Sequence, residues 1–284
     1  MKLVLGTVQF GLNYGINNDD GAPSKEQVFN ILDHACKAGI DELDTADGYG
    51  MAQERLAEYF QISGQKFQLM SKFTLDGSST ITQHLQNSLK RLGTTTLLGY
   101  YFHKFEDFKP FQHFDEVKVL KSQGIINNLG VSIYTDEELS IAANNPHIDV
   151  IQLPFNLFDS RDSKLRLMEK AKKNNKVLYA RSAFLQGLFL MKQEKFTGKL
   201  KTMAAPVQQI QALAESHNLS TADLALSFVL NHPLIDKVLI GVDTVEQLKS
   251  NLSAQSKSLT PELLNQLKKI KIEDAALLNP GNWI

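Results

Sequence analysis

Four residues in the first half of the chain could together transfer a proton: Asp44, Tyr49, Lys72 and His103. Asp44, Lys72 and His103 each end a short apolar run, and Tyr49 follows Asp44 in the turn 47–50. A neighbouring lysine ammonium stabilises a phenolate and so lowers the cost of proton transfer from a tyrosine at neutral pH. A carboxylate at Asp44 would keep Lys72 charged and in place. The set therefore predicts acid catalysis by Tyr49, with His103 hydrogen-bonded to a substrate oxygen.

Three further polar residues, Ser132, Gln152 and Ser182, end later apolar runs of the same kind. A single polar residue at a strand end often caps a helix or binds a loop amide. Six strand ends in succession that carry polar residues are hard to explain as caps. In a parallel barrel the loops at the carboxyl ends of the strands form the active-site face. We therefore expect these side chains to share one pocket.

The elements that must position these residues alternate along the chain. Short apolar runs rich in β-branched residues are followed by amphipathic stretches, which is typical of strand-helix units around a parallel sheet. The eight expected strands are Leu3–Gly6, Glu42–Asp44, Phe67–Lys72, Leu97–His103, Asn127–Val131, Val150–Pro154, Val177–Arg181 and Lys237–Ile240.

Helical spacing of apolar residues marks stretches such as 28–36 and 81–92, and capping-box patterns begin others. Two helical stretches, 207–217 and 221–231, lie between the last two expected strands. No Pro-, Gly- or Ser-rich linker divides the chain. The pattern predicts an α/β fold, a closed (β/α)8 TIM barrel that forms one domain over residues 1–284.

Composition argues against several classes of function. The chain has 30 basic and 31 acidic residues and a formal net charge of -1, so nucleic acid is not expected as a partner. No apolar stretch approaches the roughly 18 residues that span a bilayer, which predicts a cytoplasmic protein without membrane contact. The histidines other than His103 lack ligand spacing, so no metal site is expected. The G-x-G-x-x-G, P-loop and G-x-S-x-G motifs are absent.

The order of the motifs resembles that of the aldo-keto reductase family, in a compact bacterial form. The segment Asp44-Thr45-Ala46-Asp47-Gly48-Tyr49-Gly50 resembles the Asp-Thr-Ala-x-x-Tyr-Gly motif of that family. Nearly the whole chain takes part in the resemblance. The other segments that follow in family order are Gly6–Gly11, Ser71-Lys72, Tyr100–His103, Gly130–Ser132, Gln152–Asn156 and Arg181–Gly187.

The resemblance implies a role for each residue of the first group. Tyr49 would be the proton donor, Asp44 and Lys72 would tune it, and His103 would orient a carbonyl group. Hydride would come from a nicotinamide cofactor. The expected reaction is therefore the NAD(P)H-dependent reduction of a small aldehyde or ketone to an alcohol.

The resemblance also implies a set of residues that bind the cofactor. Ser132 and Gln152 would hold the carboxamide of the nicotinamide ring. Phe155 stands where many members have a tyrosine that stacks on this ring. Further contacts are implied after the seventh and eighth strands, at Ser182, Gly187, Ile240, Gly241, Val242, Gln247 and Asn251.

The choice between NADP and NAD stays open on these residues. Gly241 and Gln247 occupy places where the family commonly has a lysine and an arginine that grip the 2′-phosphate of NADP. Losing both cations would forfeit charge-assisted contacts of roughly 1.5–3 kcal/mol each. Asp243 adds a negative charge nearby. The resemblance alone slightly favours NADPH.

Two other functions fit the same residues: a regulatory subunit that binds the cofactor without turnover, and a dehydratase or epimerase on the same barrel. The segment 186–205 has few aromatic residues besides Phe189 and Phe196, which favours a polar, sugar-like substrate. The sequence does not indicate the oligomeric state. Arg161 fits a surface ion pair or a substrate clamp, and Trp283 fits a pocket wall or packing outside the barrel.

Overall fold

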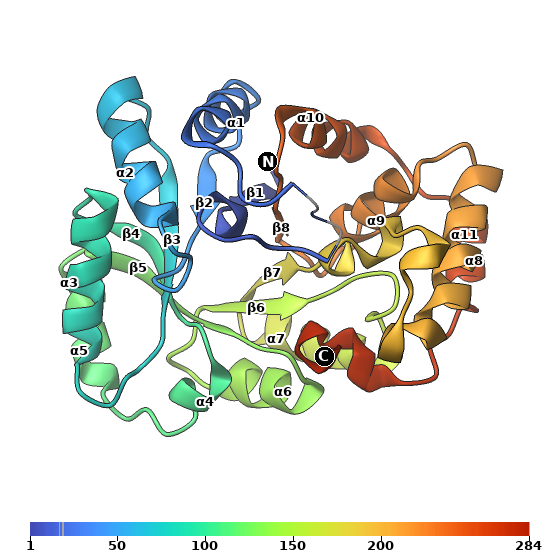
Figure 1. Cartoon of the computed structure of the whole chain (residues 1–284). Coiled ribbons are helices and arrows are strands. Elements are labelled where there is room, and N and C mark those ends of the chain that lie inside the picture. Colours follow the sequence, from blue (N-terminus) through green and yellow to red (C-terminus); the bar gives the residue numbers. More distant parts are fainter. Residues whose placement is uncertain (17, 19, 284) are drawn as a thin grey trace.

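The computed structural model describes residues 1–16, 18 and 20–283, and its centre is a closed barrel of parallel strands (Figure 1). Each strand pairs with its neighbours in sequence, and β8 pairs with β1 to close the ring. The prediction of a (β/α)8 TIM barrel is thus confirmed. The strands are β1 (Leu3–Gly6), β2 (Glu42–Asp44), β3 (Gln68–Phe73), β4 (Leu97–Phe102), β5 (Ile126–Ser132), β6 (Val150–Pro154), β7 (Val177–Arg181) and β8 (Lys237–Ile240).

The helices surround the barrel (Figure 1). One of them begins after Thr135 with a capping box, a pattern that the sequence contains: the Thr135 side chain accepts a hydrogen bond from Glu138 N, and the Glu138 side chain accepts one from the Thr135 backbone. The helices are α1 (Lys25–Lys37), α2 (Ala52–Ser63), α3 (Ile81–Leu92), α4 (Phe105–Phe108), α5 (Phe114–Ser122), α6 (Asp136–Asn144), α7 (Asp162–Lys173), α8 (Ala204–Ser216), α9 (Thr221–Leu230), α10 (Val245–Ser253) and α11 (Pro261–Leu267).

Side chains fill the interior of the barrel, so that it is a packed core. Tyr101 on β4 is 1% exposed and packs with Val4, Met70, Val150 and Tyr179 from four other strands. The ring of Tyr179 belongs to this layer, and its hydroxyl group donates to Glu42 Oε2 at 2.7 Å. Because the lower part of the barrel is full, only the carboxyl ends of the strands remain for a ligand.

Glycines on β4 and β5 make the room that Tyr101 needs. Tyr101 and Gly130 face each other in the register of these two strands. A Cβ atom at Gly130 would overlap the ring of Tyr101, and one at Gly99 would lie 2.5 Å from its Cε1 atom. The Tyr101 ring therefore fits in the barrel only because positions 99 and 130 are glycine.

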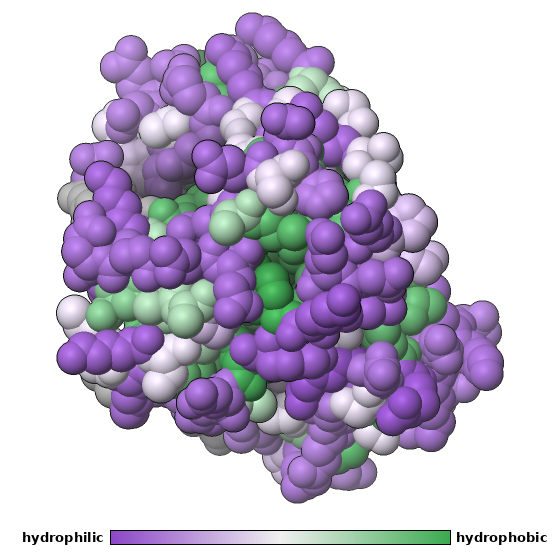
Figure 2. All heavy atoms as spheres, turned by 90° about the vertical axis from the view of Figure 1, so that its right-hand side faces the viewer, coloured by the Kyte–Doolittle hydropathy of each residue, from purple (hydrophilic) through white to green (hydrophobic). Residues whose placement is uncertain are grey.

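The outer surface is predominantly hydrophilic on the side that carries α8, α10 and α11. In Figure 2 this side shows apolar side chains gathered in a hollow near its centre, with hydrophilic residues around it. Among the described residues, no helix has the length and apolar character needed to cross a membrane.

Replacing Gly130 with alanine is expected to lower the free energy of unfolding by about 1–3 kcal/mol, because the added methyl group must displace the buried ring of Tyr101. Urea denaturation of Gly130→Ala measures this. Gly48→Ala is a matched control, since a Cβ atom there meets nothing within 4 Å. Equal stability of the two variants would contradict this account of the barrel core.

Candidate active site

A buried ion pair between Lys72 and Asp44 lies at the carboxyl ends of β3 and β2. Each residue is 1% exposed. Lys72 Nζ donates to Asp44 Oδ1 and, at 3.2 Å, to the carbonyl oxygen of Thr45. Gln152 on β6 donates its Nε2 to Asp44 Oδ2 at 2.9 Å. Both carboxylate oxygens therefore have donors, as a buried carboxylate requires.

Tyr49 reaches this ion pair from the turn that follows β2. Its hydroxyl oxygen lies 3.4 Å from Lys72 Nζ. The rings of Tyr49 and His103 meet edge to face, with centroids 5.6 Å apart and an interplanar angle of 83°. His103 follows directly after β4, and its backbone N–H donates to the carbonyl oxygen of Phe73 at 2.8 Å. The structure thus brings together all four residues that were predicted to be catalytic.

The surroundings set the protonation of Tyr49 and Lys72. Burial raises the pKa of Tyr49, although the Lys72 ammonium opposes this shift. Burial disfavours the charge on Lys72, but the Asp44 carboxylate and the Tyr49 phenol outweigh it and raise the pKa of the lysine. At neutral pH the site therefore holds a protonated phenol beside a charged ammonium group.

His103 is uncharged at neutral pH. Burial lowers its pKa to about 3, and the positive charges of Lys72 and Arg181 add to this effect. A neutral imidazole can donate one hydrogen bond and accept another. His103 can therefore bind a carbonyl oxygen without itself supplying a proton.

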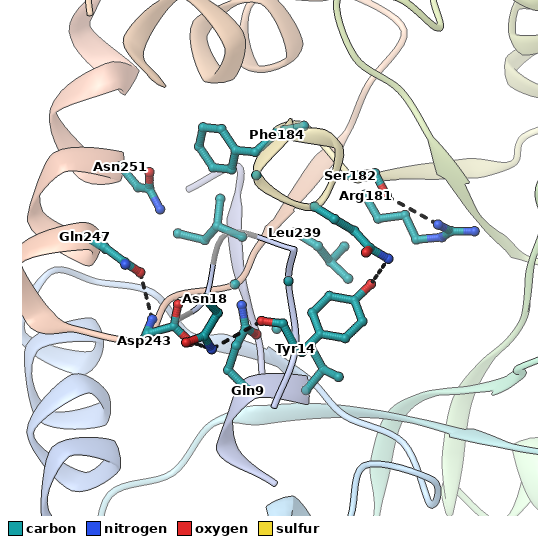
Figure 3. Close-up of a pocket in the computed structure, with 18 of the residues that line it drawn as sticks. Gln9, Tyr14, Asn18, Arg181, Ser182, Phe184, Leu239, Asp243, Gln247 and Asn251 are labelled. Atoms are coloured by element: carbon teal, nitrogen blue, oxygen red, sulfur yellow. Dashed lines mark hydrogen bonds between the residues drawn. The ribbon is translucent and has the colours of Figure 1, made fainter. Parts of the chain in front are cut away.

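A channel leads from Tyr49 towards α10, with a volume of about 410 Å³ (Figure 3). Its walls come from the loops after β1, β7 and β8. Lys72 and His103 do not line it: they lie behind Tyr49 and beside it. Seven residues of the predicted cofactor set do line it, namely Gln152, Ser182, Gly187, Ile240, Gly241, Gln247 and Asn251.

The expectation that Phe155 stacks on a cofactor ring is wrong. Side chains alternate along a strand, so Gln152 points into the barrel while Phe155, three residues later, points outward. There the ring packs against Phe228 and His232, with centroids 5.9 and 4.7 Å away. Val242, which is fully buried, likewise packs in the outer core and does not line the channel.

Ser132 also lies off the channel wall. It ends β5 directly beside Gln152, its partner in the register of β5 and β6, and is 5% exposed. Gln152 itself lines the channel, as does Asp44, whose carboxylate accepts the hydrogen bond from Gln152 Nε2.

Tyr14, Gly15 and Asn18, which follow the first strand, line part of the channel and were not anticipated. Gln186 Nε2 donates to the hydroxyl group of Tyr14 at 3.0 Å, and Asn18 Nδ2 donates to Asp243 Oδ1 at 3.2 Å. Tyr14 is thereby bonded to the β7 side of the channel and Asn18 to the β8 side (Figure 3). The Asn and Gly residues of this part of the sequence could have indicated a turn, but the partners of Tyr14 and Asn18 are distant in sequence.

Arg181 at the end of β7 is a further channel residue that the sequence prediction missed. Its guanidinium group lies 4.1 Å from the centre of the Tyr134 ring and donates to the carbonyl oxygen of Ile133 at 2.9 Å. Its position beside Ser182, at a strand end, could have indicated it. Among the described residues that line the channel, no other carries a cationic side chain.

The channel floor offers an unused hydrogen-bonding atom. Gln9 is 8% exposed, and its buried Oε1 has no hydrogen-bond partner among the described residues. An orphaned polar atom of this kind suits a bound polar ligand. The Gln9 side chain fills the space beside Gly241, where a Cβ atom would lie 2.8 Å from Gln9 Cδ.

Two residues with open roles lie away from the channel walls. Arg161 is bound to Asp136 at 3.2 Å and to Asp159 at 3.4 Å, which supports the surface ion pair. Trp283 donates its Nε1 to the carbonyl oxygen of Leu277 at 2.8 Å and packs on the apolar cluster of α8 and α11, outside the barrel. In the described part of the chain, no group of three or more His, Cys, Asp or Glu side chains could hold a metal ion.

Comparison with known proteins identifies the family of the chain and agrees with its barrel fold. The model of the aldo/keto reductase family matches residues 2–272. Aldo-keto reductase str7 of Strobilurus tenacellus is 23% identical over 92% of this chain and 84% of its own. The uncharacterized oxidoreductase YqkF of Bacillus subtilis is 27% identical over 96% of this chain and 97% of its own. The crystal structure of PA4992 from Pseudomonas aeruginosa shares the fold, with a TM-score of 0.65 and 19% identity over 90% and 89% of the chains. The chain therefore belongs to the aldo-keto reductase family, whose members are oxidoreductases that generally use NAD(P)H.

Proposed function

We propose that the chain reduces the carbonyl group of a small aldehyde or ketone to an alcohol, with NAD(P)H bound in the channel. One observation carries this proposal. The hydroxyl group of Tyr49 lies at the end of the channel, 3.4 Å from an ammonium group whose charge is held by a buried carboxylate. This is the arrangement of an acid that must give up its proton and then be stabilised as an anion.

Each residue of the site has a distinct part in the reaction. A nicotinamide cofactor held in the channel would supply the hydride for the carbonyl carbon. Tyr49 donates its proton to the carbonyl oxygen as negative charge develops there. Lys72 stabilises the phenolate that remains, and Asp44 keeps Lys72 charged and fixed. Neutral His103 donates a hydrogen bond to the same carbonyl oxygen and so orients the substrate.

The residues of the channel fit the cofactor. Gln152 gives its Nε2 to Asp44, which leaves its Oε1 free to accept a hydrogen bond from the nicotinamide carboxamide. The loop after β7 runs through left-handed backbone at Leu185, Gln186 and Gly187, with φ values of 47°, 53° and 93°. Strained backbone of this kind is common where a loop binds a ligand. We assign this loop, with Ser182 and the segment 240–251, to the cofactor.

The substrate is proposed to be a polar, sugar-like carbonyl compound. Phe189 and Phe196 are buried in the apolar cluster formed with α8 and α11, and do not line the channel. Near the catalytic residues, Arg181 and the hydroxyl group of Tyr14 supply polar groups.

Replacing Tyr49 with phenylalanine should lower kcat by roughly 10²- to 10⁴-fold, because no other group stands at the place of the donated proton. Binding of the reduced cofactor, followed by calorimetry, should change little. Tyr59→Phe is the control, since it removes a hydroxyl group that binds Asp33 between α2 and α1. Unimpaired turnover by Tyr49→Phe would refute the assignment.

Neutral His103 also predicts how stability depends on pH. In the unfolded chain a histidine takes up a proton near pH 6.5, whereas in the folded chain His103 does so only near pH 3. The unfolded state thus binds more protons in this window, and the stability that His103 contributes falls as the pH falls through it. We expect this contribution to lower the free energy of unfolding by roughly 1 kcal/mol for each pH unit below about 6. His103→Gln should remove this part of the pH dependence.

Urea denaturation at several pH values between about 7 and 4 measures this dependence. His113→Gln removes an exposed histidine and serves as the matched control. The same change of pH dependence in both variants would contradict the buried, neutral state of His103.

A further inference from the structure

We propose that the channel selects NADH over NADPH and that Asp243 is the residue that makes this selection. The inference rests on the proposed function, because it concerns the cofactor of the same channel. It names which form of the cofactor the chain accepts, and the side chain that excludes the other form.

The position of the catalytic residues fixes which end of the channel takes the adenosine half. Asp44, Tyr49 and Gln152 line one end, where the nicotinamide must lie for the reaction. The remainder of the channel extends to Asp243 and to α10. Figure 3 shows Asp243, Gln247 and Asn251 gathered on the side opposite Arg181 and Ser182. The adenosine ribose, which carries the 2′-phosphate in NADPH alone, therefore belongs near α10.

The charge at this end is negative. Asp243 is half-buried in the channel wall, and Asp20 lies close enough to act on its carboxylate. Arg181, the cationic residue among the described lining residues, lies at the other end, where it acts on Tyr49 and His103. A phosphate monoester adds about −1.5 to −2 charges at pH 7. Near α10 this charge would meet a carboxylate, and none of the described residues that line this end of the channel carries a positive charge.

Gly241 has no side chain to supply a cation, and the amide group of Gln9 fills the space beside it. A Cβ atom at this position would overlap the amide group of Gln9. The neutral Gln247 is itself engaged, because its Oε1 accepts a hydrogen bond from Asp243 N at 2.8 Å. Gln9, Gly241 and Gln247 thus fill this part of the α10 end with neutral groups.

The hydrogen-bonding capacity of Asp243 points the same way. Its Oδ1 accepts a hydrogen bond from Asn18, and a carboxylate has lone pairs on both oxygens for further donors. An ionised carboxylate can only accept. A ribose 2′-hydroxyl group can donate to it, whereas a 2′-phosphate brings acceptors alone. A carboxylate favours NAD by the same chemistry in dinucleotide-binding folds of other architecture.

Calorimetric titration of the wild-type chain with NADH and NADPH tests the selection directly. We expect NADH to bind roughly tenfold or more tightly than NADPH. ADP-ribose and its 2′-phosphate, which lack the nicotinamide, should show the same order. Asp243→Asn keeps the shape and the acceptor for Asn18 but removes the charge. This variant should tighten NADPH binding selectively and reduce the preference by about tenfold.

Glu246→Gln is the matched control, because it removes one negative charge from the exposed first turn of α10, outside the channel. Equal or tighter binding of NADPH by the wild-type chain would overturn the inference and leave the proposed function intact. An unchanged preference in Asp243→Asn, or an equal change in Glu246→Gln, would remove the role of Asp243. Failure of both nucleotides to bind would overturn the inference and the proposed function together.

Discussion

The buried ion pair of Lys72 and Asp44 is the constraint on which the site depends. Two opposite charges that are each 1% exposed persist only if every charged atom has a partner. Those partners come from β2, β3 and β6, which are not all neighbours in the barrel. The ring of strands must therefore close correctly before the ion pair is stable. Once formed, the pair holds a fixed positive charge beside the hydroxyl group of Tyr49.

Much of the fold could be predicted because strand and helix periods are local signals. The bounds of five of the eight strands were predicted to the residue, and the ends of the others differ by one residue. His103, for example, was expected inside a strand, but it follows the last residue of β4. The short helix α4 was not anticipated, since four residues are too few to establish a helical period.

The residues of the site that lie at strand ends were predictable from the sequence. Asp44, Lys72 and His103 could be found by residue type and by their place after apolar runs. Phe155 was misassigned because its place in a motif was considered without the alternation of side chains along β6. The contacts of Tyr14 with Gln186 and of Asn18 with Asp243 escaped prediction for another reason. They join residues far apart in sequence, and no periodic pattern encodes them.

The close packing of Gln9 against Gly241 also limits how this chain can change through mutation. A single substitution that introduces a long side chain at Gly241 meets the amide group of Gln9, which comes from the opposite end of the sequence. Shortening Gln9 first would leave a hole in the channel floor until the second substitution fills it. The two positions are therefore coupled: a side chain at Gly241 requires the Gln9 amide to take another rotamer or position 9 to change as well.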